Sequence, residues 1–457
     1  MSVIEEVAGY LARAGATELP GEVRERAALH LLDTVAAMVS GSRLPAARVA
    51  RTWAHSQGRF SGEEAATIVG MGERTSPVVA ALCNGMAAHA DETDDSHPDS
   101  LSHPGCAVVP AALAGVEAVG GSGSLLLRSV AAGYDIGGRV GRAAPLKERD
   151  VSRGGPSSHA MVGAFGATAA AAVALGLDAT QVRHSLSYAT QLCSGTLTWM
   201  RDPHHVEKAF VFGGMPASQG LLATTLVRAG GGGVEDAFSG RPNWLDGLPV
   251  TPDREALVAE LGSRYEVMRT TLKKYSVGSP AQAAVEAMVE LVRDHSLQAS
   301  EVEGIEISLP SDSYFIVDGR DMPSINCQYL VVGTLQDGRF SFEMAHDTQR
   351  MRRDDVVSLL SRTVLAPDET IRGTRAARLR VTRRVAGRVE VLEHEVTHVR
   401  GTAAVPMSVA EVREKSLDLM GPVLGARPAA VLCDRLLALD GVPRVAELTA
   451  LMAGASQ

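Results

Sequence analysis

Aromatic residues are scarce in this 457-residue chain, at 4% of the total, although hydrophobic residues make up 45% of it. Alanine and glycine supply much of the apolar content, and alanine has the highest helix propensity of all residues. This composition favours closely packed helices over an aromatic-rich β core. The chain is also too long for one ordinary hydrophobic core, so we expect two or three domains.

The chain also lacks an excess of positive charge, paired cysteines and long apolar runs. Its formal charge of -9 argues against a general nucleic-acid-binding protein. No apolar run approaches the ~20 residues of a membrane span, and the N-terminal segment does not have the form of a signal peptide. The cysteines show no C-x-x-C spacing and indicate neither a disulfide framework nor a zinc ribbon; they are Cys83, Cys106, Cys193, Cys327 and Cys433. We expect a soluble, cytoplasmic protein without a nucleic-acid or membrane partner.

Helical periodicity without strands dominates the chain to about residue 230. Asp33 lies inside the apolar stripe of a helix that ends near residue 40, where we expect a buried carboxylate that caps a neighbouring helix. Gly133, Gly137 and Gly141 recur every four residues, which places them on one helix face and permits close contact with another helix. The first part of the chain is therefore predicted to be an all-α bundle.

The pattern changes near residue 272. GIEISL alternates as a strand does, and LRVTRRVAGRVEVLEHEV reads as a β-hairpin around Ala386-Gly387. Helical patterns lie before the strand, at 279–294, and between the strand and the hairpin, at 326–337 and 353–362, and helix returns after Pro406. The predicted fold is mainly α: an all-α domain built from both chain ends, residues 1–270 and 400–457, with an inserted α+β domain at 271–399.

The stretch from Asn84 to Gly105 carries most of the chemically active side chains. It combines histidines with carboxylates, namely His89, Glu92, Asp94, Asp95, His97 and His103. A solvated loop between helices is one interpretation, because Asp, Ser and Pro are good turn formers. An active-site loop is the other, because a plain turn needs no histidines among its carboxylates. The residues alone leave both interpretations open.

Three motifs in this stretch resemble the MmgE/PrpD family: a small-residue helix ending in NG-x-x-x-H, the acidic cluster DETDDSH, and HPG before an Ala-rich helix. Further matches at 157–177, 208–220 and 273–280 extend the resemblance over nearly the whole chain. It implies a helical domain with a smaller α+β lid. It also implies a homodimeric lyase of the dehydratase or decarboxylase type, or an isomerase, that acts on a small di- or tricarboxylic acid without a metal or organic cofactor.

The resemblance also implies roles for individual residues. His103 falls on the histidine of the HP motif, Lys208 on a family lysine before a helix start, Glu92 on an Asp or Glu, and Ser96 on a Thr. A helix that starts just after His103 would favour neutral imidazole and attract a substrate carboxylate. The catalytic candidates are His103, Lys208, Glu92, Ser96 and His159, and the substrate-binding candidates are Lys273, Asp95, His97 and Tyr314.

The chain departs from the family pattern at three positions, one of which is Thr93 in the acidic cluster. Val211 replaces the histidine of the usual KPxHxG motif, and Gly278 falls where some relatives have a catalytic histidine. Two other functions therefore stay open. A metal-dependent hydrolase or hydratase would use Asp94, Asp95, His97 and His103 as ligands. A catalytically silent scaffold would keep the fold alone.

Overall fold

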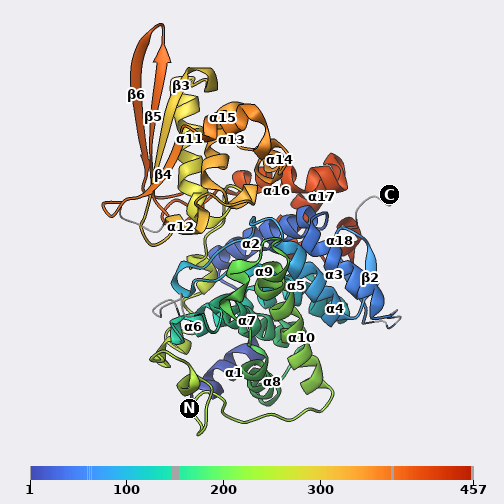
Figure 1. Cartoon of the computed structure of the whole chain (residues 1–457). Helices are drawn as coiled ribbons and strands as arrows, with labels where there is room; N and C mark the ends of the chain where they lie inside the picture. Colours follow the sequence, from blue (N-terminus) through green and yellow to red (C-terminus); the bar gives the residue numbers. More distant parts are fainter. Residues whose placement is uncertain are drawn as a thin grey trace. The chain divides into compact units, whose positions relative to one another are not determined.

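The computed structural model describes residues 2–58, 60, 62, 64–146, 154–371 and 375–453. The structure is mainly α, as the sequence predicts, and it separates into two compact units (Figure 1). Unit 1 consists of Met1–Ala90, Asp94–Thr271 and Ser408–Gln457. Unit 2 consists of Leu272–Met407 together with the short segment Asp91–Thr93.

Unit 1 is built from helices contributed by both chain ends. They are α1 (Val3–Ala14), α2 (Gly21–Gly41), α3 (Pro45–Ser56), α4 (Pro77–Ala88), α5 (Gly105–Ala118), α6 (Gly123–Ala143), α7 (Ser158–Ala174), α8 (Ala179–Leu192), α9 (Val206–Ala209), α10 (Met215–Arg228), α16 (Val409–Leu424), α17 (Ala426–Leu437) and α18 (Ala446–Leu451).

The expectation that the first part of the chain has no strands is wrong. Strands β1 (Ala66–Ile68) and β2 (Glu73–Thr75) form a short antiparallel pair. Gly70 and Gly72 lie between them with φ of 80° and 68°, in the left-handed region that glycine adopts without steric cost. The turn that joins these strands therefore depends on two glycines with positive φ, and an alternating apolar pattern in the sequence does not reveal it.

Helices α6 and α7 pack backbone against backbone through the predicted glycine face. A Cβ atom on Gly133 would lie 2.8 Å from the carbonyl oxygen of Gly166, and one on Gly137 would lie 2.9 Å from that of Val162. Both distances are shorter than real Cβ contacts allow. The close helix contact predicted from the glycine spacing is confirmed.

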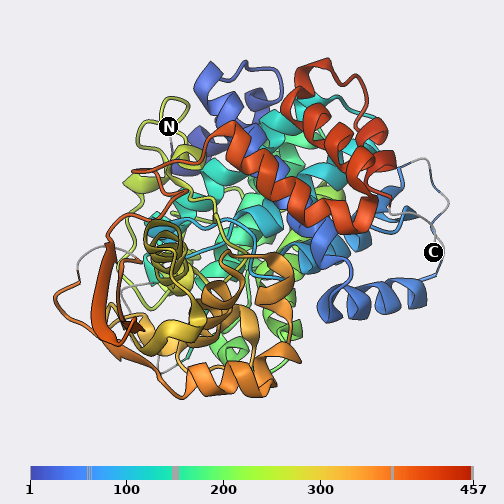
Figure 2. The same ribbon diagram turned by 90° about the horizontal axis from the view of Figure 1, so that it is seen from above.

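The C-terminal helices α16 and α17, drawn in red, lie side by side in Figure 2. Helix α16 also packs on α2, where the ammonium of Lys415 donates to Asp33 Oδ1 at 2.6 Å. Both side chains are buried. Asp33 is thus buried as expected, but it pairs with a lysine from the other end of the chain and does not cap a helix.

Helices α9 and α10 and the turn between them form one apolar stretch, Val206–Arg228. Among the described residues this stretch alone is long and apolar enough to cross a membrane. In the structure 67% of its most apolar part is buried inside the protein, as is common for a core helix of a globular domain.

Unit 2 contains a sheet of order β4-β3-β5-β6 with helices packed against it. The predicted strand is β3 (Val302–Leu309), parallel to β4 (Thr363–Pro367) and antiparallel to β5 (Ala377–Val385). The predicted hairpin is confirmed, because β5 pairs with β6 (Arg388–Val396) across Ala386 and Gly387. Both turn residues have positive φ, 48° and 81°, as a two-residue hairpin turn requires.

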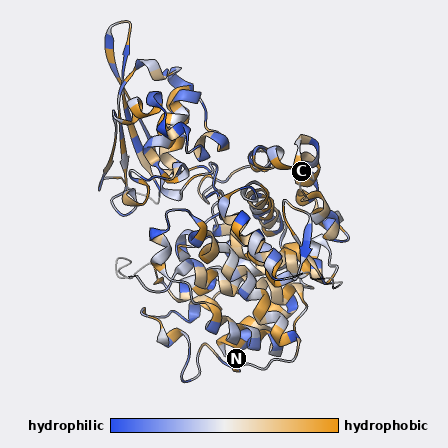
Figure 3. Ribbon diagram, turned by 45° about the vertical axis from the view of Figure 1, so that its right-hand side comes forward, coloured by the Kyte–Doolittle hydropathy of each residue, from blue (hydrophilic) through white to orange (hydrophobic). Residues whose placement is uncertain are grey.

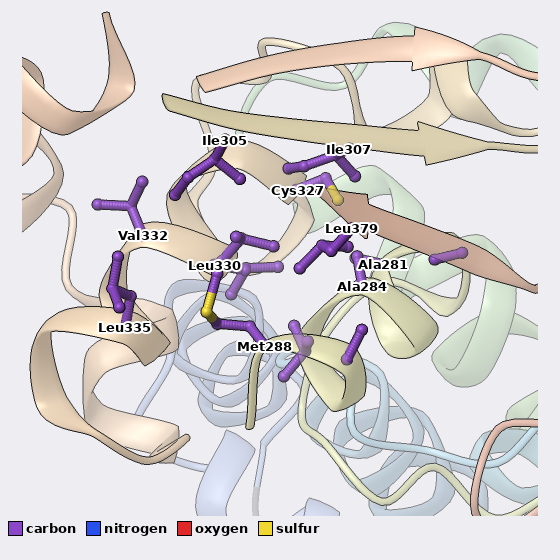
Figure 4. Close-up of a cluster of buried hydrophobic side chains, with 14 of the residues drawn as sticks. Ala281, Ala284, Met288, Ile305, Ile307, Cys327, Leu330, Val332, Leu335 and Leu379 are labelled. Carbon is purple, nitrogen blue, oxygen red and sulfur yellow. The ribbon is translucent and has the colours of Figure 1, made fainter. Parts of the chain in front are cut away.

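The core of unit 2 lies between the sheet and its helices. These are α11 (Gln282–His295), α12 (Tyr314–Val317), α13 (Cys327–Asp337), α14 (Phe342–His346) and α15 (Asp354–Leu360). Figure 4 shows Met288 and Leu330 from the helices pointing toward Ile305 and Leu379 of the sheet. Polar and apolar residues lie side by side along the β5–β6 hairpin in Figure 3, which fits a sheet with one buried and one solvated face.

Candidate active site

The histidine- and carboxylate-rich loop is buried. From His89 to His97 every residue is at most 5% exposed. Asp94 and Asp95 are both fully buried. Ionisable groups are rarely this deep unless they are paired. The interpretation of this stretch as a solvated loop is therefore excluded.

Backbone pairing fixes the second half of the loop. Ser96 and Thr271 exchange two backbone hydrogen bonds, of 2.9 and 2.8 Å, and His97 and Ser102 pair in the same way. Helix α5 then begins at Gly105, close to its predicted start. His103 therefore lies directly before the N-terminus of α5, where the helix dipole favours negative charge.

Asp94 lies between two histidines of unit 1. Its Oδ2 is 2.9 Å from His89 Nδ1 and 3.5 Å from His103 Nδ1. The side chain of His103 is 11% exposed, whereas those of Asp94 and His89 are fully buried. A buried carboxylate next to imidazole orients the ring and stabilises its protonated form. The structure places the Asp94 carboxylate where it can act on His103.

One phenylalanine brings the histidines together. Phe212 lies in a π-helical turn, Phe210–Gly214, between α9 and α10. Its ring stacks on His159 at a centroid distance of 3.7 Å and on His89 at 4.3 Å. The rings of His103 and His159 are 5.3 Å apart. Isolated π turns are frequent at functional sites, because the extra residue redirects a side chain.

Lys208 lies beside the same aromatic cluster. Its Nζ is 5.2 Å from the centroid of Phe212 and 5.4 Å from that of Trp199, within the range of cation–π interactions. Phe212 and Trp199 thus lie next to the ammonium, whereas Phe210 is 36% exposed. Val211, at the position of the family histidine, is buried.

Protein groups surround His97. Its Nε2 is 3.1 Å from Glu266 Oε2, and its Nδ1 is 2.8 Å from the hydroxyl of Ser100. Burial alone would raise the pKa of Glu266, but the hydrogen bond from His97 and the charge of Arg142 lower it to about 2. The substrate-binding role of His97 stays a prediction.

Protein groups also surround the carboxylate of Asp95. Its carboxylate accepts hydrogen bonds from His30, Tyr134 and the backbone N–H of Gly105. Ser96 contributes its backbone to the pairing with Thr271 described above. The substrate-binding role of Asp95 and the catalytic role of Ser96 stay predictions.

Unit 2 holds a second group of predicted site residues. The ammonium of Lys273 donates to the backbone oxygen of Glu92 at 2.7 Å and lies 3.6 Å from its Oε2, and both side chains are buried. Tyr314 begins helix α12 and is half-buried. A side chain at Gly278, the position of the second family histidine, would meet Ile325 Cγ2 at 3.1 Å. The structure therefore brings Glu92 and Lys273 together.

Sequence analysis did not name two residues that contact the histidines of unit 1, His205 and Trp199. His205 Nε2 is 2.9 Å from the backbone oxygen of His89, and the two rings stack at 5.2 Å. Trp199 packs edge-on against His159 and Phe212. The sequence offers a weak signal for these residues, the adjacent His204-His205 pair shortly before Lys208.

Three buried groups in unit 1 lie close enough together to bind a metal ion: His89, Asp94 and Cys106, whose ligand atoms lie within 4.8 Å of one another. Each also has a protein partner. His89 pairs with Asp94, and the thiol of Cys106 donates to the backbone oxygens of His103 and Phe212 at 3.1 and 3.4 Å. Hydrogen bonds within the protein therefore involve all three groups.

Family comparison agrees with the motifs. The MmgE/PrpD N-terminal domain matches residues 5–255, and the MmgE/PrpD C-terminal domain matches residues 275–438. The chain belongs to the MmgE/PrpD family.

Individual relatives are similar along most of their length. The chain is 24% identical to cis-aconitate decarboxylase of Aspergillus terreus, over 98% of this chain and 95% of the relative. It is 24% identical to a cis-aconitate decarboxylase-like protein of Aspergillus oryzae, over 99% and 98% of the two chains. With human cis-aconitate decarboxylase it shares 26% identity over 80% of this chain and 76% of the relative.

Proposed function

We propose that the protein is a carboxy-lyase that removes carbon dioxide from a small di- or tricarboxylic acid of the cis-aconitate type, without a metal or organic cofactor. The similarity to cis-aconitate decarboxylases over nearly the full chain supports this proposal. The observation that carries it is the grouping of His103, Asp94, His159 and Lys208 around Phe212 in unit 1.

The reaction needs a proton donor and a cation. The bond between carbon and the departing carboxylate breaks, carbon dioxide leaves, and the electron pair stays on carbon, conjugated with a remaining carboxylate. A proton from an imidazolium then forms the new C–H bond. His103 is suited to carry this proton, because the Asp94 carboxylate 3.5 Å away stabilises the charged ring and opposes the preference for neutral imidazole at the start of α5. Lys208 offsets the negative charge of a carboxylate that remains on the substrate.

The aromatic surroundings strengthen these effects. Trp199 and Phe212 lie beside the Lys208 ammonium, so a substrate carboxylate bound there would meet it in a poorly solvated setting. Charge-assisted hydrogen bonds are shorter and stronger than neutral ones, and a lower local dielectric strengthens them further. His159, stacked on Phe212, is a second group that can exchange protons.

A panel of di- and tricarboxylates followed by NMR in deuterated water tests the proposal. A carboxy-lyase gives carbon dioxide and a product with deuterium at one of the carbons that share the electron pair left by the departing carboxylate. A hydro-lyase gives loss or gain of water, and an epimerase gives deuterium exchange without a change in composition. The His103→Ala variant is the control for contaminating activity. Absence of turnover for every acid, or products of the second or third kind, would overturn the proposal.

Cofactor independence has its own test. Activity should survive dialysis against a chelator, with metal content measured before and after. Loss of activity that one metal ion restores would reassign His89, Asp94 and Cys106 as its ligands.

A further inference from the structure

Asp95 is surrounded by hydrogen-bond donors from three helices. Its Oδ2 accepts from the hydroxyl of Tyr134 in α6 at 2.5 Å and from His30 Nδ1 in α2 at 2.6 Å. Its Oδ1 accepts from the backbone N–H of Gly105, the first residue of α5, at 3.0 Å. The carboxylate is fully buried, as are the side chains of both donors.

Gly105 fits this group of side chains without spare room. A Cβ atom at this position would lie 2.7 Å from Thr34 Oγ1, 2.7 Å from the Tyr134 hydroxyl and 2.8 Å from Asp95 Oδ1. Real Cβ atoms do not come this close to other atoms. The N-terminus of α5 therefore packs directly against Asp95 and Tyr134. The dipole of α5 favours a negative charge on the carboxylate at this position.

Burial favours the neutral form of both side-chain donors to Asp95. Burial lowers the pKa of His30, although its hydrogen bond to Asp95 opposes the effect. Burial and the negative charge of Asp95 raise the pKa of Tyr134 well above its usual value. A buried carboxylate needs several donors to stay ionised, and removing one leaves it undersatisfied.

This group has direct chain connections to the candidate acid–base pair. Asp94 directly precedes Asp95, and His103 lies two residues before Gly105. Both members of the Asp94–His103 pair are thus attached to the same buried anchor. We propose that Asp95, His30 and Tyr134 are positioning residues, which set the separation and orientation of Asp94 and His103 and do not touch the substrate. For Asp95 this proposal replaces the substrate-binding role that the sequence predicted.

The kinetic effects that we expect rest on the proposed function. The expected effect on the position of the His103 ring does not. Misplacement of a catalytic group by about 1 Å can lower a rate by about 10²-fold. We therefore expect kcat to fall about tenfold in Tyr134→Phe and about 10²-fold in Asp95→Asn, with KM within about threefold of the native value.

A second readout needs no substrate. In protein labelled with ¹⁵N-histidine, the His103 imidazole resonances are assigned by their loss in His103→Ala. Their shifts and their titration should change in Tyr134→Phe and in Asp95→Asn. The matched control is Tyr329→Phe in unit 2, which likewise removes one hydroxyl from a buried tyrosine. The Tyr329 hydroxyl donates to the backbone oxygen of Met344 at 2.8 Å.

The outcomes separate the two proposals. Altered His103 resonances in Tyr134→Phe but not in Tyr329→Phe support the anchor, even when no acid is turned over. His103 resonances and kcat that stay at the level of the control would overturn it. If Asp95→Asn does not fold, Tyr134→Phe alone decides, because it removes only one oxygen atom.

Discussion

The two units differ in how their ion pairs are buried. Unit 1 buries ion pairs among small-residue helices: Asp135 and Arg139 are both fully buried, and Asp33 and Lys415 nearly so. In unit 2 many ion pairs lie on the surface of the sheet. Arg384 and Glu303, for example, have side chains that are 50% and 40% exposed.

The difference indicates which unit uses buried charges to fix the positions of its side chains. Two charges lose their hydration when they are buried, and their attraction repays this cost only when the geometry is good. An exposed pair keeps its hydration and contributes little to stability. Unit 1 therefore holds these side chains in fixed places, as the proposed acid–base site requires. Unit 2 departs from its own pattern at Lys273 and Glu92, where a lysine and a glutamate are buried together.

The largest effect is expected at His103. If the buried charges of unit 1 serve chemistry, His103→Ala should lower kcat by ~10²–10⁴ while the protein stays folded. Steady-state kinetics on an accepted acid measures the rate, and a thermal melt measures the fold. A near-native rate in a folded variant would leave His103 as a residue that only precedes a helix.

Lys208 should affect binding more than His103 does. Lys208→Ala should raise KM about tenfold or more, because a charge-assisted bond in a poorly solvated site is worth ~1.5–3 kcal/mol. Lys208→Arg should restore binding only in part, since guanidinium is planar and larger. The effects of Lys208→Ala and His103→Ala should not add in the double variant. Full additivity would place the two residues in separate sites.

Glu266 tests the stability side of the comparison. Its folded-state pKa of about 2 is depressed, so its contribution is present above the unfolded-state pKa of ~4.5 and is lost as pH falls toward 2. Glu266→Gln should therefore lower the free energy of unfolding at pH 7 by on the order of 2 kcal/mol. It should also flatten the pH dependence of that free energy below pH ~4.5. Denaturant unfolding at several pH values measures both, and an unchanged acid limb would contradict the assignment.

Arg384 should give the smallest effect. Arg384→Ala removes an exposed ion pair with Glu303 in unit 2 and should change the free energy of unfolding by no more than about 0.5 kcal/mol. High salt should leave even less difference between the variant and the native protein. A loss comparable to that of Glu266→Gln would remove the contrast between the two units.

Local patterns in the sequence predicted the secondary structure well. The glycine spacing predicted the close contact between α6 and α7, and the alternation around Ala386-Gly387 predicted the hairpin. These features depend on residues near one another in the chain. The short β1–β2 pair was missed, because three-residue strands are too brief to show alternation.

The candidate site could be predicted only in part, because much of it depends on long-range contacts. The loop from His89 to His103 stood out by composition, and the family motif drew attention to His103 and Lys208. The role of Phe212 depends on the π-helical turn, which has no signature in the sequence. The pairing of Asp95 with His30 joins residues 65 positions apart, and no local pattern reports it.

The three-residue segment Asp91–Thr93 has a consequence for how the gene can be divided. Unit 2 is encoded mainly by one continuous stretch, Leu272–Met407, yet it includes this segment, which lies far upstream among codons for unit 1. A fragment covering 272–407 alone would leave Lys273 without the backbone oxygen and carboxylate of Glu92. Unit 2 is thus not a cassette that can be excised, swapped between relatives or expressed separately without change. Chimeric enzymes would need to exchange residues 91–93 together with 272–407.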